Sequence, residues 1–218
     1  MLEKSERPED YAYNIQRIID VCKKSNTNLI LVKPIANKKF PPGLGKGNFI
    51  FYHYFGLNDK SSSALEIKDR RFVDGYKFFE EGKYKEASEV YSSILADFDV
   101  NTCGNEYTQV LINNYAIAQA NLYAFDEAIY LLKILLKENN VRSEIIYYNI
   151  AQLSLKKGDT EAFKFYIEKS YDLDSSMYRI RKPYREALDT LIKKNPNINV
   201  IDLYKLCPEN VFLDHCHL

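Results

Sequence analysis

The sequence predicts a mainly helical protein in which a block of helical hairpins is inserted between two pieces of an incomplete parallel α/β sheet. Residues 1–63 contain an amphipathic helix, an apolar strand and a loop, and residues 64–175 contain three similar pairs of apolar helices. Residues 176–218 return to a helix, an apolar strand and a loop. A helix followed by a nearly all-apolar strand is typical of α/β proteins, because helices cover both faces of a parallel sheet.

Composition narrows the possible classes of function. The chain has 218 residues, 46% of them hydrophobic and 14% aromatic, which is typical of a globular protein. Lys plus Arg equals Asp plus Glu, at 30 each, so the net charge gives no reason to expect binding to nucleic acid or to an anionic membrane. Apolar runs such as residues 28–32 are too short to span a bilayer. We therefore expect no nucleic-acid partner and no membrane span.

The first piece of the chain begins with an amphipathic helix between residues 8 and 24. Its apolar side chains recur at helical spacing: Tyr11, Ile15, Ile18, Ile19 and Cys22. The run NLILVKP, residues 28–34, then predicts a short strand that is covered on both faces. Helix and strand together predict the first half of an α/β unit.

A loop rich in proline and glycine follows the first strand. Within it, Gly43-x-Gly45-Lys46-Gly47 invites comparison with a phosphate-binding loop. The G-x-x-x-x-G-K-[ST] spacing is missing, and no helical pattern follows directly. We interpret this stretch as a connection and not as a phosphate site.

The middle of the chain contains three segments of similar sequence, residues 72–95, 113–136 and 147–174. Each predicts an apolar helix, a turn and a second apolar helix. In the second segment, Ala116 and Ala128 stand twelve residues apart, and Gly75 and Ala87 in the first segment have the same spacing. Small residues at these positions allow the two helices of a pair to approach closely.

These segments resemble tetratricopeptide repeats, whose period is 34 residues. Asp126-Glu127-Ala128 and Thr160-Glu161-Ala162 lie at that spacing. Two features depart from the family pattern. Ala87 and Ala128 are 41 residues apart, which predicts a longer connecting loop, and the third repeat is expected to have a turn one residue short. That shorter turn places Phe163 where a small residue is usual.

Stacked helix pairs form a concave surface that commonly binds peptides or partner domains. Asn113 and Tyr148 are the predicted partner-binding residues, because their polar atoms need hydrogen-bond partners if they are buried. The alternative is that residues at these positions only pack neighbouring helices together. By repeat position the predicted concave residues are Phe72, Tyr76, Phe79, Asn113, Ile117, Tyr148 and Gln152.

The last piece of the chain predicts a helix from Pro183 to about Lys194 and a buried strand over residues 198–204. We expect this strand to lie beside the first one, parallel to it, in an incomplete three-layer unit. Such a pair has unpaired edges and one uncovered apolar face.

The chain closes on FLDHCHL, in which Asp214 and His217 stand three residues apart. Chemistry in parallel α/β sheets lies in loops beyond the carboxyl ends of the strands. A carboxylate that accepts a hydrogen bond from one ring nitrogen leaves the other nitrogen available as a general base. Asp214 and His217 are therefore the candidate catalytic residues.

These residues resemble the SGNH (GDSL-type) hydrolases, whose last motif is Asp-x-x-His. Residues 11–42 look like the helix, strand and loop of one branch of that family, and residues 170–218 look like its return segment. That branch carries tetratricopeptide helices at this place. The resemblance implies a flavodoxin-like parallel sheet, with Asp214 as the orienting carboxylate and His217 as the general base of a serine esterase or acyl-transfer enzyme.

The nucleophile block of that family is missing from the sequence. No Gly-Asp-Ser occurs anywhere in the chain, so the nucleophilic serine has no counterpart. Without a nucleophile the double displacement cannot run. We expect this chain to be inactive by itself and to require a missing N-terminal hydrolase half as a partner. The alternative hypothesis is a non-catalytic repeat scaffold that binds protein or peptide.

A metal site is not predicted. Cys207, His215, Cys216 and His217 include zinc-ligand types, but C-x7-H-C-H is not a usual structural pattern and adjacent residues rarely converge on one tetrahedral ion. We expect no metal and no cofactor.

The sequence leaves the compartment open. Residues 1–10 are polar and charged, which does not predict a signal peptide. The four cysteines form no C-x-x-C pair and are expected to be free thiols in a reducing compartment. This chain alone therefore predicts a cytoplasmic protein, whereas a longer natural protein with an N-terminal signal would be periplasmic or membrane-tethered.

Overall fold

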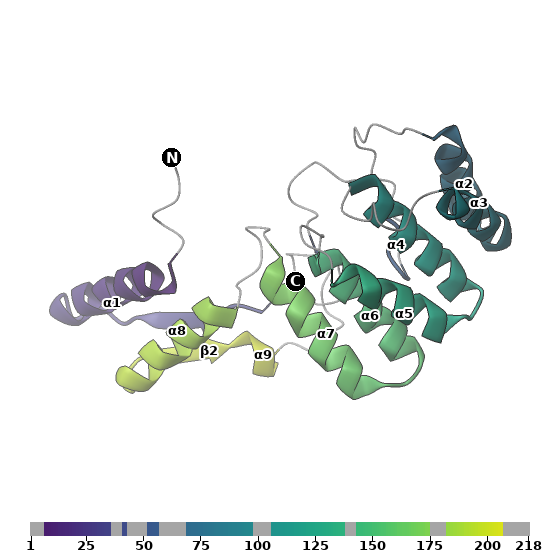
Figure 1. Ribbon diagram of the computed structural model, residues 1–218. Coiled ribbons are helices and arrows are strands. Elements are labelled where there is room, and N and C mark those ends of the chain that lie inside the picture. The colour runs from purple at the N-terminus through teal and green to yellow at the C-terminus, as the bar shows by residue number, and fades with distance from the viewer. Residues whose placement is uncertain are drawn as a thin grey trace. The chain divides into compact units, whose positions relative to one another are not determined.

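The structure is a computed structural model that describes residues 7–35, 41–42, 52–56, 69–97, 106–137, 143–174 and 182–206. The chain forms two compact units (Figure 1). Residues 1–40 and 177–218 form the unit that we call the α/β unit, and residues 41–176 form the helical unit. Within the described ranges the protein is mainly helical, with a small parallel two-stranded sheet. This confirms the predicted class at that level.

The α/β unit is built from both ends of the chain. Helix α1 (Pro8–Lys24) and strand β1 (Ile30–Lys33) come from the first end. Helix α8 (Lys182–Lys194), strand β2 (Asn199–Asp202) and the short helix α9 (Leu203–Leu206) come from the other. The two strands pair in parallel, as predicted, from Ile30 opposite Asn199 to Lys33 opposite Asp202.

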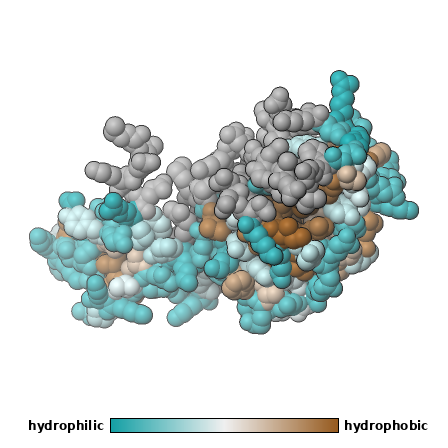
Figure 2. Space-filling view, viewed as in Figure 1, coloured by the Kyte–Doolittle hydropathy of each residue, from teal (hydrophilic) through white to brown (hydrophobic). Residues whose placement is uncertain are grey.

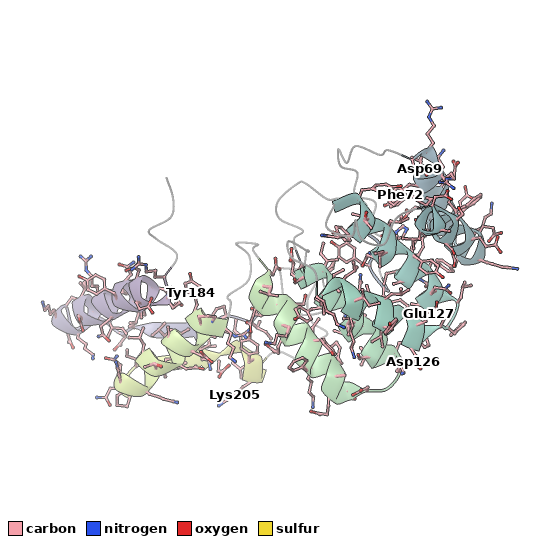
Figure 3. The ribbon with its side chains drawn as sticks, viewed as in Figure 1. Asp69, Phe72, Asp126, Glu127, Tyr184 and Lys205 are labelled. Carbon is pink, nitrogen blue, oxygen red and sulfur yellow. The ribbon has the colours of Figure 1, made fainter. Side chains whose placement is uncertain are left out.

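Helices α1 and α8 pack against each other in this unit. Tyr11 and Tyr184 meet edge to face with ring centroids 5.6 Å apart, and Figure 3 labels Tyr184 on α8. At the other end of the contact, Lys23 donates a hydrogen bond of 2.7 Å to the side chain of Asn195. Ile19 of α1 is buried at 1% exposure. Of the stripe predicted for α1, Ile19 is buried and Tyr11 contacts α8, whereas Ile18 is 50% exposed.

The sheet has two unlike faces. On one face the Lys33 amino group lies 2.8 Å from a carboxylate oxygen of Asp189 in α8. On the other face Ile30, Val32 and Ile201 are 56%, 46% and 38% exposed. Because alternate residues of a strand point to opposite faces, these three side chains form one apolar surface. The expected uncovered apolar face is present in the described part of the unit.

The helical unit contains three helix pairs in sequence (Figure 1). Helix α2 (Arg70–Glu80) packs on α3 (Tyr84–Ala96), α4 (Glu106–Asn121) on α5 (Phe125–Leu135), and α6 (Ser143–Lys156) on α7 (Thr160–Leu173). Neighbouring pairs are joined by contacts of α3 with α4 and of α5 with α6. Figure 2 shows an apolar region on the visible face of this unit, bordered by hydrophilic side chains.

The three turns inside the pairs are alike. They span residues 81–83, 122–124 and 157–159, so the third turn is as long as the others and not one residue short. The middle residue of each has a positive φ: 75° at Gly82, 67° at Tyr123 and 82° at Gly158. Glycine adopts this left-handed backbone without strain. The equal turns place Phe163 in the same register as Ala87 and Ala128.

The two helices of the first pair approach each other closely. A Cβ atom added to Gly75 of α2 would lie 2.8 Å from the Cε1 atom of Tyr91 in α3. In the next pair, Ala116 and Ala128 are fully buried. The small residues that recur at twelve-residue spacing thus lie where two helices are in contact.

The boundary between the units differs from the expected division at residue 63. Residues 52–56 belong to the helical unit, although the sequence assigned them to the α/β piece. Tyr52, His53 and Tyr54 are buried at 5%, 3% and 5% exposure. The physical reason is a set of backbone hydrogen bonds to α4 and α6, which the local sequence does not encode.

Candidate functional site

The candidate site is a groove in the helical unit that residues 52–56 of the same chain occupy. We call these residues the bound segment. It contacts α2, α4 and α6, the first helix of each pair, through hydrogen bonds and stacked rings. This is the side of the helix pairs on which the sequence predicts a concave binding surface.

Three asparagine side chains hold the backbone of the bound segment. The His53 N–H donates to the Asn114 Oδ1 atom at 2.8 Å, and the Phe55 N–H donates to the Asn149 Oδ1 atom at 2.9 Å. The His53 carbonyl accepts from the Nδ2 atoms of Asn113 and Asn149, both at 3.0 Å. These contacts use only main-chain atoms of the segment, so they recognise extended backbone and not a particular side chain.

The asparagines also bind one another. Asn149 Nδ2 donates to Asn113 Oδ1 at 2.9 Å, and Asn113 Nδ2 donates to Asn114 Oδ1 at 3.1 Å. All three side chains are fully buried. Since a buried amide without partners is costly, the network fixes the orientation of each amide group that contacts the segment. The result is a preorganised set of donors and acceptors.

The His53 side chain enters an aromatic pocket. Its ring stacks on Phe79, with centroids 3.5 Å apart and planes 13° apart, and on Tyr76 at 4.8 Å and 21°. The Nε2 atom lies 2.8 Å from the Tyr91 hydroxyl. Burial holds the pKa of His53 well below its usual value, so the ring is neutral. A neutral imidazole has one donor and one acceptor nitrogen, and the hydroxyl can pair with either.

Other aromatic residues flank the pocket. The ring of Tyr54 meets Tyr148 edge to face at 6.0 Å, and that of Phe55 meets Phe125 at 6.3 Å. Behind the pocket, Phe72 is fully buried, with its ring centroid 5.8 Å from that of Tyr91. Figure 3 labels Phe72 on α2. Phe72 therefore packs α2 against α3.

The structure brings together the two predicted partner-binding residues. Asn113 hydrogen-bonds the bound segment, and Tyr148 packs on its Tyr54 ring. Both are buried, so the surface that they were expected to offer to a partner is filled by the chain itself.

Sequence reasoning missed five residues of the site: Asn114, Asn149, His53, Tyr91 and Phe125. Asn114 and Asn149 are 35 residues apart and occupy the same position in α4 and α6, seven residues before the last residue of each helix. A polar residue that recurs at the buried position of successive repeats was the available signal. His53 carried no comparable signal.

The two predicted catalytic residues, Asp214 and His217, lie outside the described residues. At the carboxyl ends of the two strands, the Lys33 amino group lies 3.1 Å from Asp202 and 2.8 Å from Asp189. The hydrogen bond that Lys33 donates to Asp189 raises the pKa of Lys33 against the opposing effect of burial, with a further contribution from Asp202. These three side chains line a groove of about 680 Å³.

The described ranges contain no group of three or more His, Cys, Asp or Glu side chains that is placed to hold a metal ion. No described helix combines the length and the apolar character needed to cross a membrane.

Comparison with known protein families, with curated proteins and with solved structures finds no match to this chain.

Proposed function

We propose that the helical unit is a binding module for an extended peptide, which its buried asparagines hold by the backbone. The observation that carries this proposal is the set of four hydrogen bonds between the side chains of Asn113, Asn114 and Asn149 and the backbone of residues 53 and 55. A partner would be a protein segment of the same chemical class as the one that the groove holds now.

The energetics support recognition of this kind. Each such bond contributes about 0.5–1.5 kcal/mol net, and four together are enough to orient a short extended segment. The asparagines already bind one another, so little side-chain freedom is lost when a peptide enters. Helix pairs that stack in sequence, here resembling tetratricopeptide repeats, commonly present such surfaces.

The test is binding of a labelled synthetic peptide, with the sequence of residues 52–56 and a soluble Gly-Ser-Lys flank, to the full chain. Fluorescence anisotropy should show saturable binding that Asn149→Ala weakens at least tenfold. Gln119→Ala is the matched control, because this α4 side chain donates to Tyr115 on its own helix and not to the segment. Equal affinities of the two variants would contradict the proposal.

A second proposal concerns the α/β unit. We propose that Asp214 and His217 are the orienting carboxylate and the general base of an SGNH-type ester hydrolase whose serine lies in upstream sequence of a longer native chain. Support comes from the parallel pairing of β1 and β2 and from the exposed apolar face of Ile30, Val32 and Ile201, which suits a sheet that another layer covers.

The intact mass of the native protein, captured from its source with an antibody, tests this second proposal. A mass well above 25.5 kDa, together with serine-probe labelling that His217→Ala abolishes, is the expected result. A native mass of 25.5 kDa would leave the repeat scaffold as the remaining candidate.

A further inference from the structure

The His53 pocket makes two separate demands on its occupant. The stack on Phe79, with ring planes 13° apart and centroids 3.5 Å apart, accepts a flat ring and excludes branched or flexible side chains. The Tyr91 hydroxyl, which also hydrogen-bonds the Asn114 side chain, lies 2.8 Å from Nε2 and favours a heteroatom at the edge of that ring. An imidazole satisfies both demands, whereas a phenyl ring satisfies only the first.

The surroundings of the pocket also select the charge state of the side chain that occupies it. His53 is 3% exposed and lies among the rings of Tyr76, Phe79 and Tyr91. Transfer of a charged group into such a site is costly unless it is paired. A lysine or an arginine side chain, which is always charged at neutral pH, is therefore a poor occupant, and neutral histidine is a good one.

Residues 52–56 are connected through the chain to α2, whose first residue is Arg70. A tethered segment meets its groove at an effective concentration in the range of about 1 mM. An external peptide must displace it, so the apparent affinity is reduced by the fraction of molecules with an open groove.

We propose that this pocket is a specificity site for a neutral histidine of a partner's extended peptide, and that residues 52–56 occupy it as an internal competitor. This inference rests on the proposed peptide-binding function. The partner is then a protein that presents an extended segment with histidine between aromatic neighbours, as the sequence Tyr-His-Tyr-Phe of the bound segment does. Tyr148 and Phe125 receive the two aromatic residues that follow the histidine.

The experiment uses full-length chains and three labelled peptides. The peptides carry the sequence of residues 52–56 with histidine, phenylalanine or alanine at the second position. The chains are wild type and His53→Ala, in which the internal competitor loses its pocket contacts while the groove residues are unchanged. Circular dichroism and a thermal melt establish that the variant is folded.

We expect the histidine peptide to bind the His53→Ala chain at least tenfold more tightly than it binds wild type. On the His53→Ala chain it should also bind at least tenfold more tightly than the alanine peptide, with the phenylalanine peptide between them. Equal affinity of the three peptides would overturn the specificity site. Equal affinity of the two chains for the histidine peptide would overturn the competitor.

Failure of every peptide to bind either chain would overturn the proposed function itself and would make the segment a fixed part of the core. If the His53→Ala chain does not fold, Tyr91→Phe replaces it. This variant keeps the ring and removes the hydroxyl, so it should reduce the preference for histidine over phenylalanine to less than threefold. An unchanged preference would overturn the assignment of Tyr91.

Discussion

Asn149→Ala is the substitution that tests the groove most directly. The Asn149 amide makes three of the contacts described above. It donates to the His53 carbonyl at 3.0 Å and to Asn113 Oδ1 at 2.9 Å, and it accepts from the Phe55 N–H at 2.9 Å. Alanine keeps the helix and removes all three bonds.

The expected loss of stability follows from the polar groups that Asn149→Ala leaves without a partner. The His53 carbonyl keeps its bond from Asn113, so its loss is small. Asn113 Oδ1 and the Phe55 N–H lose the partner that Asn149 supplies, and a buried group left unsatisfied costs about 1–3 kcal/mol. Phe55 is partly exposed, and water can take the place of the lost acceptor there. We therefore expect unfolding of the helical unit to become easier by about 2–4 kcal/mol.

Two measurements check this value. Urea unfolding followed by circular dichroism gives the change in free energy, and amide hydrogen exchange reports the Phe55 N–H itself. Asn121→Ala is the control, because this amide donates only a helix-end bond to the Ile117 carbonyl at 2.8 Å. A change below about 0.5 kcal/mol for Asn149→Ala, or one no larger than that of the control, would refute the reasoning, since a network worth 2–4 kcal/mol would not then exist.

Three other predictions concern different parts of the chain. Gly75→Ala should destabilise the helical unit by about 1 kcal/mol in urea unfolding. A Cβ 2.8 Å from Tyr91 overpacks the helix pair, which costs about 1–3 kcal/mol, while alanine recovers about 1 kcal/mol of helix propensity. A stabilised variant would contradict the close approach of the two helices. Because the pKa of His53 is lowered in the folded protein, the unfolded state takes up the proton first as pH falls. The stability that His53 contributes is therefore complete above pH 6.5. It is lost as pH falls below 6.5 toward the folded pKa, by up to about 1.4 kcal/mol per pH unit. His53→Phe should remove that part of the slope in unfolding measured from pH 7 to pH 4, and an unchanged slope would mean that the ring is not held neutral. Lys33→Met should destabilise the α/β unit by about 1 kcal/mol or less, because its ion pairs with Asp189 and Asp202 are partly exposed. The control is Lys193→Met on the exposed side of α8, which should have no effect in the same assay.

Much of the fold follows from local pattern. The apolar runs predict β1 and β2, and Pro183 in the first turn of α8 and the stripe of α1 predict the helices beside them. Small residues at twelve-residue spacing predict the helix pairs. The distance between two packed helices depends on the volume of the side chains between them and very little on the rest of the fold. The length of the third turn could not be predicted in this way, because Glu-Ala occurs one residue earlier in α7 than in α5.

The candidate site could be predicted only in part. Asn113 and Tyr148 were predicted on the principle that a buried polar atom needs a partner, and both contact the bound segment. That principle requires a partner but does not identify it. Asn149 and the His53 carbonyl that it binds are 96 residues apart in the chain.

The sequence by itself therefore determines a helical protein with small residues between paired helices and with two strands that lie side by side in parallel. Only the tertiary structure decides that residues 52–56 fill the groove of the helical unit. The physical reason is that helices and turns depend on residues within a few positions of one another, whereas the occupancy of a groove depends on main-chain groups that any extended segment carries. What distinguishes this segment is the fit of one imidazole between Phe79 and the Tyr91 hydroxyl.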